Sequence, residues 1–134
     1  MTMKGKKRAL LAAVLVALGV AAATLLPMLA SSDAETVREI RLLARDMRFY
    51  LEGQDEPNPT ISLRAGERVR IVLRNEDAGM RHDFAIASWT VRTRLLADRG
   101  EQDAIVIQVP TDRGTQPYHC TPHPRLMSGT LRIE

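Results

Sequence analysis

The residues best suited to chemistry lie in the last seventeen positions of the chain, from Tyr118 to Glu134. This stretch holds Cys120, the only cysteine of the protein, with His123 three residues later and Met127 four residues after that. A thiolate, an imidazole and a thioether in one short loop suit a soft, redox-active metal. The trigonal His2Cys geometry with a weak axial Met, which serves electron transfer by copper, needs one more imidazole. His82 can supply it.

Each of these residues also has an ordinary structural explanation. A lone cysteine in an exported protein is often a buried, inert thiol or forms an intermolecular bridge. An isolated His82 is more often a surface or core histidine, and Met127 alone would be core filler. His123, however, stands between two prolines and is poorly explained as a core residue. The spacing of Cys120, His123 and Met127 therefore favours metal binding.

Other chemistries fit the same residues less well. Zinc is the main alternative metal, because Cys and His bind it well, but a thioether ligand argues against zinc. A multicopper oxidase would need many more histidines than the three present. Nucleophilic catalysis by Cys120 with His123 is conceivable, yet two prolines hold the loop and no oxyanion element is apparent. We therefore expect a carrier of electrons and not an enzyme.

Two further residues near the candidate ligands are not expected to bind metal. Along the strand, His119 points away from Cys120. Met80 is a rival thioether near His82, and we interpret it as packing.

The segments Tyr118-His-Cys-Thr-Pro-His-Pro124 and Asn75-Glu-Asp-Ala-Gly-Met-Arg-His-Asp-Phe84 resemble the copper-binding segments of the cupredoxins, the small blue copper proteins. The Cys-x-x-His spacing is similar to the amicyanin and plastocyanin branch, whereas the His-x-x-x-Met spacing is closer to azurin. The resemblance covers residues 36 to 134. It implies an all-β, Greek-key sandwich with one type 1 copper that cycles between Cu(I) and Cu(II). The ligands that it implies are His82, Cys120, His123 and Met127.

The sequence departs from the family pattern on both sides of His82. Asp83 stands where the family usually has Asn, and Arg81 stands where amicyanin and plastocyanin have Pro. Neither departure removes a ligand. By resemblance, Asp83 places its backbone N–H near the cysteine sulfur, and both departures bear on the reduction potential and on the hydrogen bonding around that sulfur.

The resemblance also implies how electrons leave the protein. The histidine of the cysteine loop lies at the surface of cupredoxins, within an apolar patch where redox partners dock. Here Pro122, Pro124 and Leu126 would build that patch around His123, rimmed by Arg81 and Arg125. We expect a monomer and a partner with an acidic rim, such as a c-type cytochrome, an oxidase or a dehydrogenase.

The charge of the chain is unevenly distributed. The formal net charge is +3, but Lys4, Lys6, Lys7 and Arg8 stand at the N-terminus. From Asp33 onward there are 15 Arg, no Lys and 16 acidic residues, which gives −1. The domain therefore lacks the basic surface that nucleic-acid binding requires.

The basic N-terminus precedes an apolar run from Ala9 to Ala30. The run fits a signal peptide cleaved after Ser32, or a retained membrane anchor, since 22 residues at about 1.5 Å each span the roughly 30 Å hydrocarbon core. Either interpretation divides the chain into residues 1–32 and a domain of residues 33–134. It places that domain in the periplasm or at the outer face of the cytoplasmic membrane.

The remaining pattern is that of a β-sandwich, with many short alternating strands separated by Gly and Pro turns. Val69, Ile71 and Leu73 alternate with arginines and predict a half-buried antiparallel strand. The apolar phase slips by one residue between Ala44 and Met47, which predicts a β-bulge or a bend between sheets. The Leu95-Leu96 pair is expected to begin a short helix.

The sequence thus predicts an exported single-electron carrier that shuttles between redox proteins through one type 1 copper. A copper-handling protein in delivery or resistance is the alternative function, and it would need exchangeable binding of the same metal. A zinc-bound or metal-free structural β-domain is the third interpretation.

Overall fold

The structure is a computed structural model that describes residues 37–134. In chain order its elements are β1 (Arg38–Arg45), β2 (Arg48–Leu51), β3 (Thr60–Leu63), β4 (Arg68–Asn75), β5 (Ala85–Ile86), a 3-10 helix (Ala87–Trp89), β6 (Val91–Arg92), β7 (Gln102–Gln108), β8 (Gly114–His119) and β9 (Ser128–Ile133). The predicted signal peptide or anchor at residues 1–32 lies outside the described residues. Within residues 37–134, no helix is long and apolar enough to cross a membrane.

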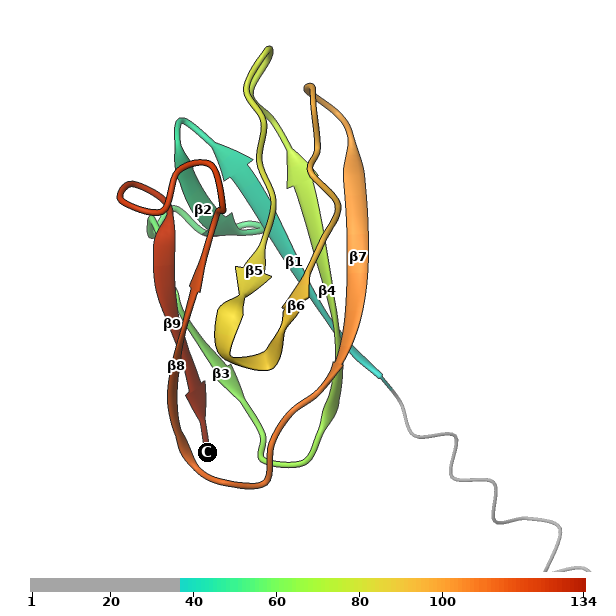
Figure 1. Ribbon diagram of the computed structural model, residues 1–134, viewed down its shortest axis with the longest axis vertical. Coiled ribbons are helices and arrows are strands. Elements are labelled where there is room, and N and C mark those ends of the chain that lie inside the picture. The colour runs from blue at the N-terminus through green and yellow to red at the C-terminus, as the bar shows by residue number, and fades with distance from the viewer. Residues whose placement is uncertain (1–36) are drawn as a thin grey trace, which may run out of the picture. The chain divides into compact units, whose positions relative to one another are not determined.

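The strands form two sheets, which confirms the predicted all-β sandwich (Figure 1). One sheet has the order β2-β1-β4-β7, and the other has the order β3-β9-β8-β5-β6. The predicted strand at Val69–Leu73 is β4, but it is antiparallel only to β7 and runs parallel to β1. β3 and β9 form a second parallel pair. Parallel pairing joins strands that are distant in sequence, so local alternation does not reveal it.

The core lies between the sheets and is built from the alternating residues of each strand. In β4, the side chains of Val69, Ile71 and Leu73 are fully buried, while Arg68, Arg70 and Arg74 are exposed; Val72 departs from the alternation and is buried. An aromatic cluster of Phe49, Phe84 and Tyr118 fills the part of the core nearest the cysteine loop. Its ring centroids lie 5.1 to 5.9 Å apart. The core therefore continues to the residues just before Cys120.

The predicted bulge or bend between Ala44 and Met47 is wrong, because the chain makes a tight hairpin there. β1 and β2 pair antiparallel up to Arg45 opposite Arg48, so Asp46 and Met47 alone form the turn. Both have positive φ, 51° and 57°, a conformation that non-glycine residues rarely adopt. Such two-residue turns usually carry Asn-Gly or Asp-Gly, and without that signal the sequence did not suggest a hairpin.

The predicted helix at Leu95-Leu96 is also wrong. Leu96 is fully buried and forms an isolated β-bridge with His82, whereas Leu95 is exposed. Burial of Leu96 beside the His82 loop decides the local structure here, and propensity does not. The loops that follow β4 and β8 lie at the same end of the sandwich, the upper end in Figure 1.

Candidate metal centre

Cys120 lies directly after β8, where the chain leaves the sheet. Its backbone N–H donates to the carbonyl of Met127 at 2.9 Å, and the N–H groups of His123 and Met127 donate to the carbonyls of Cys120 and His123 at 3.1 and 2.9 Å. The loop is thus closed by its own backbone before β9 begins. Cys120 and Met127 are both fully buried.

His82 belongs to the loop between β4 and β5. Its backbone exchanges two hydrogen bonds with Leu96, at 3.0 and 2.8 Å. The buried side chain of Asn75 holds the same loop, because its Nδ2 donates to the carbonyl of Met80 at 2.7 Å and its Oδ1 accepts from the N–H of Asp77 at 2.9 Å. These bonds fix the backbone on both sides of the histidine.

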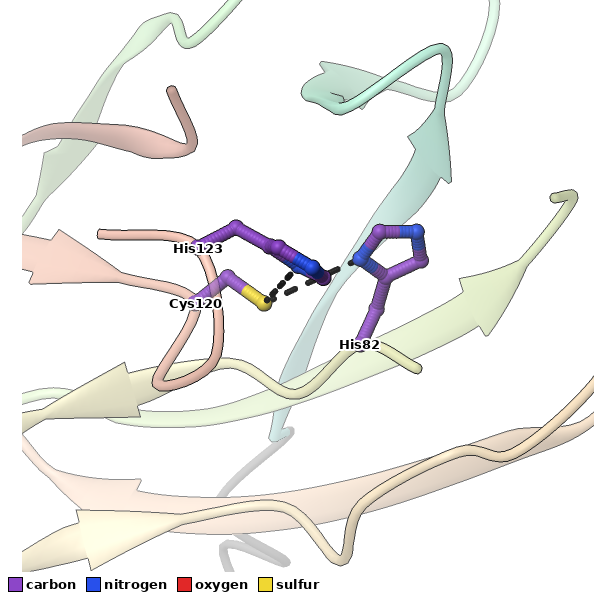
Figure 2. A group of neighbouring side chains, drawn as sticks. All are labelled: His82, Cys120 and His123. Carbon is purple, nitrogen blue, oxygen red and sulfur yellow. Dashed lines mark hydrogen bonds between the residues drawn. The ribbon is translucent and has the colours of Figure 1, made fainter. Parts of the chain in front are cut away.

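Three donor atoms converge between these two loops (Figure 2). Cys120 Sγ lies 3.8 Å from His82 Nδ1 and 3.7 Å from His123 Nδ1. All three donor atoms lie within 4.8 Å of one another. The structure therefore brings together three of the four predicted ligands, from segments 38 residues apart.

These distances fit a trigonal metal site. An ion about 2.3 Å from a sulfur and about 2.0 Å from a nitrogen separates the two atoms by about 3.7 Å when the bonds meet near 120°. A tetrahedral angle would give about 3.5 Å. The two Sγ–Nδ1 separations of 3.8 and 3.7 Å are compatible with the trigonal arrangement. One thiolate and two imidazoles in that arrangement fit a single type 1 copper.

A carboxylate sets the proton position on the His82 ring. His82 Nε2 lies 3.0 Å from Asp77 Oδ2. Because a carboxylate only accepts, Nε2 carries the hydrogen and Nδ1 presents its lone pair toward Cys120. Burial lowers the pKa of His82, and the hydrogen bond to Asp77 offsets only part of that effect. The ring is therefore neutral near pH 7, the form that binds metals.

The cysteine is held as a thiol in the absence of a metal. Burial raises the pKa of the Cys120 thiol to about 11, although backbone hydrogen bonds from Asp83 and His123 act in the opposite direction. The contact from the backbone of Asp83 agrees with the position that the family resemblance implied. A bound cation would displace the proton, because thiols coordinate as thiolates.

The side chain of Asp83 links the two loops of the site. It is buried, and its Oδ1 accepts a 2.6 Å hydrogen bond from the backbone N–H of Thr121, the residue after Cys120. The departure from Asn thus keeps an acceptor oxygen at this position and adds a formal negative charge close to the cysteine.

The other predicted roles are distributed as follows. His119 is not part of the group of metal donors among the described residues, and it lines a different hollow with Ala85 and Thr121. Met80, which was interpreted as packing, is 37% exposed and so is not part of the buried core. Asp77 is the functional residue that sequence reasoning missed. Its position five residues before His82 in the same loop was the available signal.

Comparison with protein family models and with curated protein sequences found no match. Solved structures do match. Auracyanin A, a "blue" copper protein from the green thermophilic photosynthetic bacterium Chloroflexus aurantiacus, shares 20% identity over 72% of this chain and 98% of its own, with a TM-score of 0.55. Dithionite-reduced auracyanin from Roseiflexus castenholzii shares 17% identity over 75% of this chain and 98% of its own, with a TM-score of 0.56. Reduced rusticyanin shares 18% identity over 72% of this chain and 78% of its own, with a TM-score of 0.55.

The structural similarity shows the fold alone, and the activity of the chain is argued from its own residues. The resemblance that the two copper-site segments suggested is confirmed in three dimensions over the described domain. The domain of residues 37–134 therefore has the cupredoxin fold.

Proposed function

We propose that this chain is a single-electron carrier with one type 1 copper bound by His82, Cys120, His123 and Met127. The observation that carries the proposal is the convergence of two imidazole Nδ1 atoms on a buried thiol at 3.7 and 3.8 Å. The auracyanin described as a blue copper protein has the same fold. A bound copper ion would supply a one-electron couple.

The protein's part is to hold the ligands still while the electron enters and leaves. The backbone of Cys120, His123 and Met127 is closed by mutual hydrogen bonds, and that of His82 is paired with Leu96. Met127 is buried next to the start of β9, which supports its role as the axial thioether. Thiolate and thioether suit Cu(I) and the imidazoles suit Cu(II), so a fixed set of these donors can serve both oxidation states.

Electrons would pass through the edge of the site at His123. A hollow of about 450 Å³ is lined by residues 122–126, and Leu126 at its side is 47% exposed. This apolar surface around a half-buried ligand suits a redox protein that docks briefly. Arg81, next to His82, and Arg125, two residues after His123, are both exposed, and their positive charges favour a partner with an acidic rim.

Export follows as part of the proposal. The basic N-terminus and the apolar run of residues 9–30 support a signal peptide or an anchor. The domain would then work in the periplasm or at the outer face of the cytoplasmic membrane, where it would meet other redox proteins as a monomer.

The test is a titration of the purified full-length chain with Cu(II), followed by visible absorption and EPR. We expect an intense blue thiolate-to-copper band and a narrow copper hyperfine splitting at one equivalent of Cu(II). Both signals should be lost in Cys120→Ser. Replacement of Met127 should leave the stoichiometry of one copper per chain unchanged. His119→Ala is the matched control, because it removes a neighbouring histidine outside the donor group and should keep both signals. Weak colour with an ordinary type 2 spectrum, or rapid loss of copper to a mild chelator, would refute the carrier and favour copper handling. Preference for Zn(II) over copper would favour the structural β-domain.

A further inference from the structure

Asp77 makes more contacts in the site region than its place in a loop suggests. Its Oδ2 meets His82 Nε2 at 3.0 Å. The same carboxylate accepts from the backbone N–H of Asp46 through Oδ1 at 2.9 Å and from that of Met47 through Oδ2 at 3.3 Å. One carboxylate thus joins the hairpin turn between β1 and β2 to the buried histidine.

The contact decides which ring nitrogen of His82 faces the cysteine. An Asp carboxylate has no hydrogen to donate, so it requires the Nε2–H form of the ring. That form leaves Nδ1 free to bind a cation on the side of Cys120. Histidine ligands are commonly oriented in this way by a carboxylate or a carbonyl that accepts from the second ring nitrogen.

The contact also explains why the turn exists. Asp46 and Met47 adopt left-handed conformations that are unfavourable for residues with a Cβ. Their N–H groups converge on one anionic acceptor, which compensates for the strain with charge-assisted hydrogen bonds. The carboxylate itself is held in place, because the N–H of Asp77 donates to Asn75 Oδ1 at 2.9 Å.

The hydrogen bonds around Asp77 are those of an ionised carboxylate. Its two oxygens accept from the N–H groups of Asp46 and Met47 and from His82 Nε2. The side chain is only 15% exposed, whereas that of His82 is not exposed at all. A fixed negative charge therefore lies one hydrogen bond away from a buried metal ligand.

We propose that Asp77 is a positioning residue of the metal centre: it orients the His82 ring, anchors the Asp46–Met47 turn to that ring, and biases a bound copper toward its oxidised state. The proposal rests on the proposed copper site for its last part. Its first two parts concern contacts of the protein alone and can be tested without metal.

The metal-free test is hydrogen exchange in the full-length chain, followed by NMR. In the wild type we expect a slowly exchanging His82 ring N–H and protected amides at Asp46 and Met47. Asp77→Ala should speed exchange at all three by about tenfold or more. Asp112→Asn, an exposed carboxylate in the turn before β8, is the control and should change none of them. Equal exchange in wild type and Asp77→Ala would overturn the anchoring role.

The copper-loaded test separates orientation from charge. Asp77→Ala should weaken Cu(II) binding by about 10- to 100-fold, as is typical when the partner of a histidine ligand is removed. Asp77→Asn keeps an acceptor oxygen but not the charge, so at a fixed ambient potential its ratio of oxidised to reduced copper should fall by about tenfold. Asp112→Asn should leave both quantities within about twofold.

The two proposals fail in different ways. A wild-type chain without the blue band would overturn the proposed function, and the exchange measurement would then decide the Asp77 contact alone. A blue wild-type chain whose Asp77→Asn variant keeps the wild-type copper ratio would overturn the charge role of Asp77, with the carrier function intact.

Discussion

Gly129 is the position where the smallest change should have a large effect. It lies in β9 directly opposite Tyr118. A Cβ added at Gly129 would lie 2.7 Å from Cε1 of the Tyr118 ring and still closer to its Cζ and Oη. Real Cβ atoms do not approach other atoms so closely. Gly129→Ala therefore requires the Tyr118 ring to move.

The ring is not free to move. Its hydroxyl donates a buried 2.6 Å hydrogen bond to the carbonyl of Pro59. Its face stacks on Phe84 at a centroid distance of 5.1 Å, and its edge meets Phe49 at 5.5 Å. Displacement leaves the Pro59 carbonyl unpaired, which costs about 1–3 kcal/mol. Each perturbed aromatic pair adds about 0.5–1.5 kcal/mol.

Alanine is otherwise a better strand residue than glycine, by about 0.5–1 kcal/mol. Subtracting this gain from the losses around Tyr118 leaves a net destabilisation of about 1–5 kcal/mol. That is a large share of the total stability of a small domain, which is about 5–15 kcal/mol. Urea unfolding of the metal-free full-length chain, followed by circular dichroism, measures it as a lower midpoint at constant m.

A double-mutant cycle with Tyr118→Leu tests the cause. Leucine lacks the Cε1, Cζ and Oη atoms that obstruct the new Cβ, so in that background Gly129→Ala should be neutral or slightly stabilising. The coupling between the two changes should then reach about 2 kcal/mol or more. Equal destabilisation in both backgrounds, or a cost below about 0.5 kcal/mol in the wild type, would refute the argument from ring packing.

Three further predictions concern the metal centre and its surface. Because the pKa of Cys120 is raised to about 11, binding of Cu(II) must displace the thiol proton. The apparent affinity for Cu(II) should therefore rise about tenfold per pH unit between pH 7 and 9, with release of one proton. A pH-independent affinity would contradict this. Asp83→Asn keeps an acceptor for the N–H of Thr121 but removes a negative charge. Spectroelectrochemistry should therefore show a reduction potential of the copper that is higher by about 50 mV. A lower potential would show that the charge is not the dominant effect. Arg125→Glu should slow association with an acidic redox partner and reverse its salt dependence in stopped-flow kinetics, whereas an unchanged rate and salt dependence would exclude docking at this rim.

The sequence predicted those features that depend on local patterns. The alternation of β4 was read correctly because its arginines must reach solvent while Val69, Ile71 and Leu73 fill the core. Cys120 and His123 were predicted as ligands because one short loop carries both of them. His82 was proposed because the site needs a second imidazole, and folding brings its Nδ1 within 3.8 Å of the cysteine sulfur.

What the sequence did not predict depends on contacts between distant segments. The Asp46–Met47 hairpin has no turn signature of its own and is held by the carboxylate of Asp77, thirty residues away. Leu96 leaves a helical pattern because it pairs with His82 and is buried. The parallel pairing of β1 with β4 likewise arises from the crossing of the chain between sheets. In each case a tertiary interaction overrides a local preference.

The two carboxylates of the site act on different ligands but in the same direction. Asp77 meets the ring of His82, and Asp83 holds the backbone after Cys120. A Cu(II) ion with one thiolate carries a net charge of about +1, and its reduction removes that charge. Nearby negative charge stabilises the charged state more than the neutral one, and the effect is strong where burial excludes water. Both side chains would therefore favour oxidised copper, and the proposed carrier should give up its electron more readily than a site of the same geometry with neutral residues at positions 77 and 83.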